Sequence, residues 1–175
     1  MLPIQTVVCP LDFSEPSNKA LQAAIEMAVH FKAELVILHV ISPVRPVLSD
    51  PGYIFVAPEG YEHQEKVAAE ERLRIATKQL PAELNRRTVI GTGDAADEIV
   101  RLAKTETADL IVIATHGLTG WRHLVFGSVA EKVIRLSDRP VLVIPFHEPK
   151  VSEIGWGVGR NVIDDPSDLP PHCVR

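Results

Sequence analysis

Short apolar segments alternate with longer amphipathic segments along the chain from residue 4 to residue 146. The apolar segments fall at residues 4–9, 34–40, 87–93, 109–115 and 140–146. Between them, residues 16–31, 66–80, 95–106 and 128–137 carry apolar side chains at helical spacing or helix-favouring charged residues. This order predicts five strands and four helices in strict alternation.

The apolar segments lack the polar alternation of a half-exposed strand. ELVILHV (34–40) and DLIVIAT (109–115) are apolar almost without interruption. A strand of this kind is buried on both faces, as in a parallel sheet covered by helices. The sequence therefore predicts an α/β fold with a doubly wound, five-stranded parallel sheet and helices on both of its faces.

Three helix starts carry capping residues. Ser14 precedes the helix expected at 16–31, and Asp94 precedes the one expected at 95–106. Ser128 and Glu131 have the spacing of a capping box at the start of the fourth helix.

Two segments stand outside the alternation. Residues 42–65 are rich in proline and glycine and are too long for a routine connection, so we expect a flap or a partner surface there. Residues 148–175 are expected to form a tail after a domain that spans residues 1–147, and Trp156 is the candidate apolar anchor of that tail.

The composition narrows the class of protein. The chain has 175 residues, 46% of them hydrophobic, which is enough for one sizeable core. Its net charge of -5 argues against a nucleic acid or an anionic membrane as the main partner. The two cysteines, Cys9 and Cys173, make no disulfide framework, so we expect a cytoplasmic protein. No metal site is expected, because Cys173 and His172 have no companions at ligand spacing.

The segment ATHGLTGWRHLVFGSVAEKVIR (114–135) holds the candidate chemistry. It leaves a buried strand, passes Gly117, Gly120 and Gly127, and opens a helix at Ser128. Glycine lets the backbone approach a ligand, and the free N–H groups of a helix start favour an anion. Glycines and a capping box also occur wherever a strand is followed by a helix, so these residues alone leave both interpretations open.

The same segment resembles the signature of the universal stress protein family, Gly-x2-Gly-x9-Gly-Ser/Thr followed by an apolar residue. Gly117 and Gly127 match its second and third glycines, Ser128 and Val129 follow, and Ala114 stands in place of the first glycine. PLDFSEPSNKAL (10–21), LHVIS (38–42) and RPVLVIP (139–145) are similar to the family's first turn, second strand end and last strand.

The resemblance implies a sheet of order 3-2-1-4-5 that binds ATP in the crevice between its first and fourth strands. AMP and ADP are alternatives, and Mg²⁺ would be held through the phosphates. No catalytic residue is implied. The residues that the resemblance assigns to ATP binding are Pro10, Asp12, Val40, Ala114, His116, Gly117, Gly127, Ser128 and Val129.

The resemblance also implies a homodimer formed through the last strand, 140–146. The alternative cover for that strand is the chain's own tail.

Two alternative functions stay open at this point: a dimeric scaffold that has lost the nucleotide, and a slow ATPase. Asp12, taken by itself, also fits a turn or cap residue before the first helix.

Overall fold

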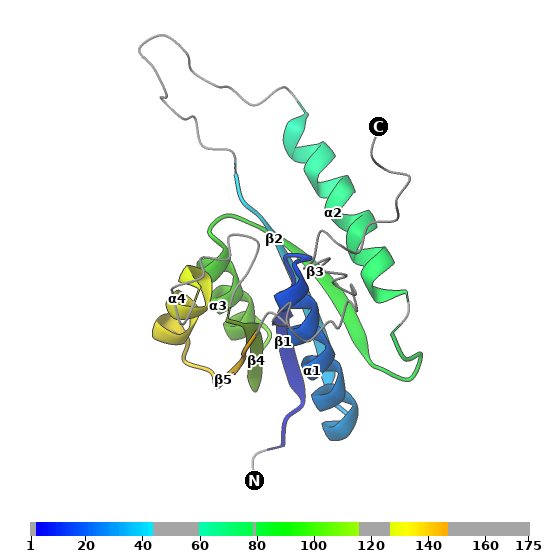
Figure 1. Cartoon of the computed structure of the whole chain (residues 1–175), viewed down its shortest axis with the longest axis vertical. Helices are drawn as coiled ribbons and strands as arrows, with labels where there is room; N and C mark the ends of the chain where they lie inside the picture. The colour runs from blue at the N-terminus through cyan, green and yellow to red at the C-terminus, as the bar shows by residue number, and fades with distance from the viewer. Residues whose placement is uncertain (1–2, 44–59, 79, 116–126, 147–175) are drawn as a thin grey trace, which may run out of the picture.

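The computed structural model describes residues 3–43, 60–78, 80–115 and 127–146. In this part of the chain five strands and four helices alternate, as predicted (Figure 1). The strands are β1 (Thr6–Pro10), β2 (Glu34–Ile41), β3 (Arg86–Thr92), β4 (Leu110–Ala114) and β5 (Val141–Ile144). The helices are α1 (Glu15–Phe31), α2 (Tyr61–Thr77), α3 (Ala95–Thr105) and α4 (Ser128–Leu136).

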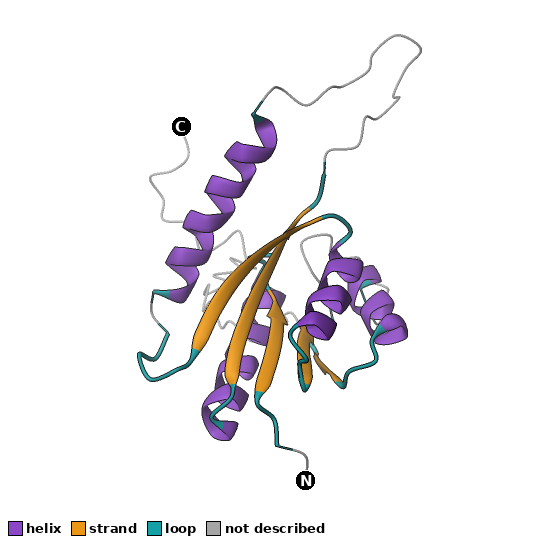
Figure 2. Cartoon of the chain, turned by 180° about the vertical axis from the view of Figure 1, so that it is seen from behind, coloured by secondary structure: helices purple, strands orange, loops and turns teal. Residues whose placement is uncertain are grey.

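The strands form one parallel sheet in the order β3-β2-β1-β4-β5, which confirms the predicted fold class. Helices α1 and α2 cover one face of the sheet, and α3 and α4 cover the other (Figures 1 and 2). In β1, Val7 and Cys9 pack on the α1 side, while Val8 packs on the α3 side. Burial on both sides explains why the strands show no polar alternation.

The thiol of Cys9 lies within the first of these two cores. Its side chain is fully buried, and burial raises the pKa of the Cys9 thiol to about 12. The neutral thiol therefore acts as a small apolar core group, because only the thiolate is a good nucleophile.

Two of the three predicted caps are confirmed. Ser14 Oγ accepts from the Ser17 amide at 3.2 Å, and Asp94 Oδ1 accepts from the amides of Ala96 and Asp97. The capping box predicted for α4 is wrong. The N-cap of α4 is Gly127, which has no side chain to accept a hydrogen bond, and Ser128 is the first helical residue.

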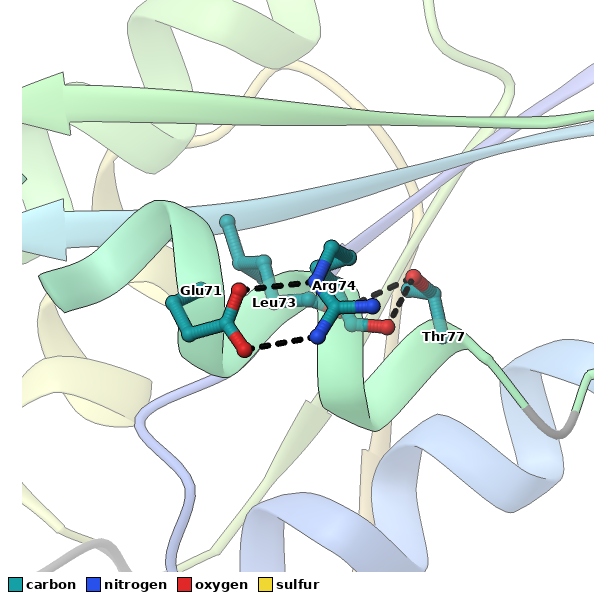
Figure 3. Close-up of polar contacts among 4 residues, drawn as sticks. All are labelled: Glu71, Leu73, Arg74 and Thr77. Atoms are coloured by element: carbon teal, nitrogen blue, oxygen red, sulfur yellow. Dashed lines mark hydrogen bonds and ion pairs between the residues drawn. The ribbon is translucent and has the colours of Figure 1, made fainter. Parts of the chain in front are cut away.

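Helix α2 begins five residues earlier than the prediction of 66–80, so residues 61–65 of the expected loop are helical. Its N-cap is Gly60, at a φ of 82°. Local bonds stabilise the helix: Arg74 pairs with Glu71 at 2.7 Å, and Thr77 Oγ1 donates to the Leu73 carbonyl at 2.8 Å (Figure 3). Its buried residues are Ala69 and Leu73, which explains the faint apolar signal in the sequence.

The remainder of the predicted 42–65 loop, at residues 44–59, lies outside the described residues. The predicted tail at 148–175, with Trp156, is not described either.

Candidate functional site

A split between two central strands creates the candidate site. Strand β1 pairs with β4 only through Val7 and Val8, whereas its pairing with β2 continues to Pro10. Pro10 is the last residue of β1 and has no N–H to donate to a neighbouring strand. Where β1 and β4 separate, at their carboxyl ends, a cavity of about 320 Å³ opens. Open α/β sheets bind ligands at this kind of switch point in the strand order.

Most of the residues predicted for the site meet at this cavity. Six of the nine line its wall: Pro10, Asp12, Val40, Ala114, Gly127 and Val129. Ser128 is not part of the lining and is exposed in the first turn of α4. His116 and Gly117 lie outside the described residues.

The turn between β1 and α1 forms one side of the cavity. Asp12 Oδ1 accepts from the amide of Ser14 at 3.0 Å and from its hydroxyl at 2.5 Å. Ser14 in turn caps α1, and the Ser17 hydroxyl donates to the Ser14 carbonyl at 3.0 Å. Asp12 is thus a turn residue and a cavity residue together, so the two interpretations of the sequence are compatible.

The junction of β4 and α4 forms the opposite side. Gly127 donates its amide to the Thr115 carbonyl, and the Thr115 amide donates to Ile144 of β5 at 3.0 Å. Thr115 Oγ1 accepts from the Phe146 amide at 3.2 Å. Gly127 has a φ of -68° and a ψ of 151°, which any residue adopts. Glycine is therefore not required here by backbone conformation.

Ala114 occupies the family's first glycine position without strain. It is the last residue of β4, where it pairs with Ile144, and it is not among the residues with positive φ. The methyl group thus adds no backbone penalty.

Sequence reasoning missed several residues of the lining. Ser17, His39, Ser42, Ala95 and Thr115 also line the cavity. His39 and Ser42 lie at or just after the end of β2, and Thr115 directly follows β4. Their place at the carboxyl ends of parallel strands was the signal that could have identified them.

Charges beside the cavity are compensated. Asp94 immediately precedes the lining residue Ala95, and Lys132 of α4 contacts Asp94 at 3.0 Å and Asp97 at 2.8 Å. The hydrogen bond from Lys132, followed by that from the Asp97 amide, lowers the pKa of the Asp94 carboxyl. The lysine thereby offsets negative charge that would otherwise repel an anionic ligand.

Neither a metal cluster nor a membrane span is found in the described part of the chain. Its His, Cys, Asp and Glu side chains form no group of three or more that could hold a metal ion. None of its helices is long and apolar enough to cross a membrane.

The open parallel sheet, with a cavity at its switch point, defines a doubly wound α/β protein. The chain belongs to the universal stress protein family, whose model matches residues 3–145. It is 34% identical over 139 residues to universal stress protein YxiE of Bacillus subtilis. That match covers 77% of this chain and 94% of the relative.

Solved structures of the family share the fold. Universal stress protein MJ0577 of Methanocaldococcus jannaschii is 28% identical, with a TM-score of 0.66 over 85% of this chain and 100% of that chain. A universal stress protein solved in complex with cAMP is 25% identical. Its TM-score is 0.62, over 82% of this chain and 98% of that chain.

Proposed function

We propose that this chain binds ATP, with Mg²⁺ on the phosphates, and acts as a nucleotide-responsive regulatory module. The observation that carries the proposal is the meeting of Pro10, Asp12, Val40, Ala114 and Gly127 at one cavity between β1 and β4. A similar universal stress protein was solved with cAMP, which shares its adenosine with ATP. AMP and ADP remain alternative ligands.

The cavity suits the nucleoside end of such a ligand. Its volume of about 320 Å³ falls at the lower end of the range of about 300–1,000 Å³ for small-molecule sites. Val40, Ile113 and Ala114 supply apolar wall for a base. The carboxylate of Asp12 can accept from a ring amine or a ribose hydroxyl.

The start of α4 suits the phosphates. The first helical hydrogen bond runs from the Glu131 amide to the Gly127 carbonyl, so the amides of Ser128, Val129 and Ala130 have no acceptor within the helix. These amides and the helix dipole favour an anion. Mg²⁺ prefers oxygen ligands and is usually held through substrate phosphates, so a dedicated protein site is not needed.

Titration calorimetry with Mg-ATP, Mg-ADP and AMP tests the proposal. We expect saturable binding to the wild-type chain and weaker binding to Asp12→Ala. Asp138→Ala, which changes an exposed carboxylate outside the lining, should bind like the wild type. The absence of both binding heat and a thermal shift at millimolar Mg-ATP would contradict the proposal. That result would favour the nucleotide-free scaffold.

A binding protein fits the site better than an ATPase. Asp12 is the one carboxylate among the described residues of the lining, and its Oδ1 accepts two hydrogen bonds from Ser14. This carboxylate is assigned to the nucleoside end of the ligand, so it is not placed to orient a water against the phosphates. Phosphate release should therefore stay at the background rate, and Ser128→Ala should leave it unchanged. Steady turnover that depends on Ser128 would favour the slow ATPase.

We also propose a homodimer through β5, an edge strand of the sheet. Exposed apolar side chains gather on β5 and α4: Leu142 is 36% exposed, Ile134 44% and Leu136 47%. Val141 and Val143 of the same strand are half-buried and pack against the core of their own sheet. An apolar edge strand needs a cover, and a two-fold interface would cover both copies at once.

Light scattering on the full chain and on a chain ending at Pro149 tests the dimer. We expect dimers in both cases, and monomers after Leu142→Lys, because a lysine on an edge strand blocks pairing. The outcome against the proposal is a full-length monomer that associates only after truncation, since the segment 148–175 would then be the cover.

A further inference from the structure

One residue beside the cavity has a backbone conformation that its side chain does not favour. Among the described non-glycine residues, Phe13, Lys32 and Thr107 have positive φ. Lys32 is the C-cap of α1 and Thr107 follows the C-cap of α3, which is where left-handed residues normally occur. Phe13, with a φ of 65°, instead precedes a helix. A bulky residue in this region must be held there by its surroundings.

Two side chains from other elements hold the Phe13 ring. The imidazole of His39 on β2 lies 4.6 Å from it between centroids, at an angle of 44°. The guanidinium carbon of Arg72 on α2 lies 4.2 Å from the ring centroid. Both contacts are favourable for an aromatic ring. The turn before α1 is therefore fixed from outside, by β2 and α2.

His39 also contacts Leu11, the residue that precedes Asp12 in the chain. Its Nδ1 lies 2.7 Å from the carbonyl oxygen of Leu11, and because a carbonyl only accepts, Nδ1 carries the proton. The Leu11 amide meanwhile donates to the Leu38 carbonyl at 2.8 Å. His39 thus contacts both chain neighbours of Asp12, Leu11 by a hydrogen bond and Phe13 by its ring.

We propose that His39 is a positioning residue of the binding site, which sets the Asp12 carboxylate through its hydrogen bond to the Leu11 carbonyl, while its ring packs on Phe13. The proposal rests on the proposed nucleotide site for its ligand. A carboxylate accepts N–H or O–H donors and repels phosphate, so the residue that positions it acts on the nucleoside end of the ligand. His39 therefore affects the binding of adenosine, whereas the start of α4 binds the phosphates.

Two variants of matched shape separate the hydrogen bond from the packing. His39→Asn keeps an amide donor near the position of Nδ1, and His39→Leu has the same branching without a donor. Loss of one such bond corresponds to about a tenfold change in an equilibrium. We expect His39→Leu to weaken both adenosine and ATP about tenfold, and to leave inorganic triphosphate binding unchanged. His39→Asn should stay within about threefold of the wild type.

A double-mutant cycle shows whether His39 acts through Asp12. In an Asp12→Ala background, His39→Leu should change adenosine affinity less than about twofold. An equal loss in both backgrounds, or an equal loss with His39→Asn and His39→Leu, would overturn the proposal. If His39→Leu does not fold, His39→Gln takes its place, because its longer side chain puts the amide near Nε2 instead of Nδ1.

Amide hydrogen exchange without any ligand separates this inference from the proposed function. The Ser14 amide donates to Asp12 and the Gly127 amide donates to Thr115. His39→Leu should speed exchange at Ser14 about tenfold relative to Gly127, and His39→Asn should not. A wild-type chain that binds no nucleotide would refute the function, and exchange at Ser14 would still decide the role of His39. Equal acceleration at both amides would refute that role.

Discussion

The two sides of the cavity are built in different ways. On the β1–α1 side, side chains fix the turn: Asp12 accepts from Ser14, and His39 bonds the Leu11 carbonyl. On the β4–α4 side, most of the contacts are made by backbone groups. Gly127 donates its amide to the Thr115 carbonyl, and α4 has no side-chain cap. The β1–α1 wall therefore depends on the identity of several side chains. The β4–α4 wall depends on the absence of a side chain at Gly127.

This difference predicts opposite responses to substitution. On the β1–α1 side, removing a side chain should reduce both the stability of the turn and the affinity for the ligand. On the β4–α4 side, adding a side chain should reduce affinity with little effect on folding. A binding measurement paired with a stability measurement therefore distinguishes the two walls.

The largest effect is expected for Gly127→Val. The backbone of Gly127 accepts any residue, so the folding penalty is the loss of a good N-cap residue, about 1 kcal/mol. The valine side chain would occupy the space next to the free amides of α4 and displace the phosphates. Two lost charge-assisted hydrogen bonds correspond to about a 100-fold weaker Mg-ATP affinity. Calorimetry and urea unfolding measure the two quantities.

Gly127→Ala is the matched control for this variant. Alanine is as poor an N-cap residue as valine, so the free energy of unfolding should fall by a similar amount, about 1 kcal/mol. Its smaller side chain should weaken Mg-ATP less than valine does. If both variants lost the same Mg-ATP affinity in spite of their different side-chain sizes, the loss would follow from the weakened helix cap. The proposed difference between the two walls would then be wrong.

An intermediate effect is expected for Ser14→Ala, on the opposite wall. This change removes the cap of α1 and one of the two donors to Asp12. The free energy of unfolding should fall by about 1 kcal/mol, up to about 2. Mg-ATP should also bind more weakly, because Asp12 loses part of its support. Ser128→Ala is the control at the other helix start, and its stability should stay within about 0.5 kcal/mol of the wild type.

The contrast between the walls also explains what the sequence could predict. Continuous apolar runs and capping residues are local signals, so they identified the five described strands and the caps Ser14 and Asp94. The start of α2 was missed because few of its residues are buried. The capping box at Ser128 failed because the spacing was right but the helix begins at Ser128 itself, one residue earlier than a serine cap requires.

The missed site residues were missed for a different reason. The role of His39 depends on Leu11, which lies 28 positions away in the sequence. Thr115 bonds Ile144 and Phe146, which are equally remote. Contacts of this kind exist only once the strands are assembled, and no periodicity in the sequence encodes them.

The smallest effect is expected for Ala114→Gly, which restores the family's first glycine. Ala114 is 7% exposed at the end of β4, in a conformation that suits alanine. Glycine within a strand costs about 0.5–1 kcal/mol relative to alanine, mostly through the entropy of the unfolded chain, so stability should fall by that amount. Because alanine introduces no strain, removing its methyl group should change Mg-ATP affinity less than about threefold, or about 0.65 kcal/mol. Parallel calorimetry on both forms measures this. A tenfold gain in affinity with glycine would mean that the methyl group encroaches on the ligand, and that the β4–α4 wall excludes side chains as far back as the strand itself.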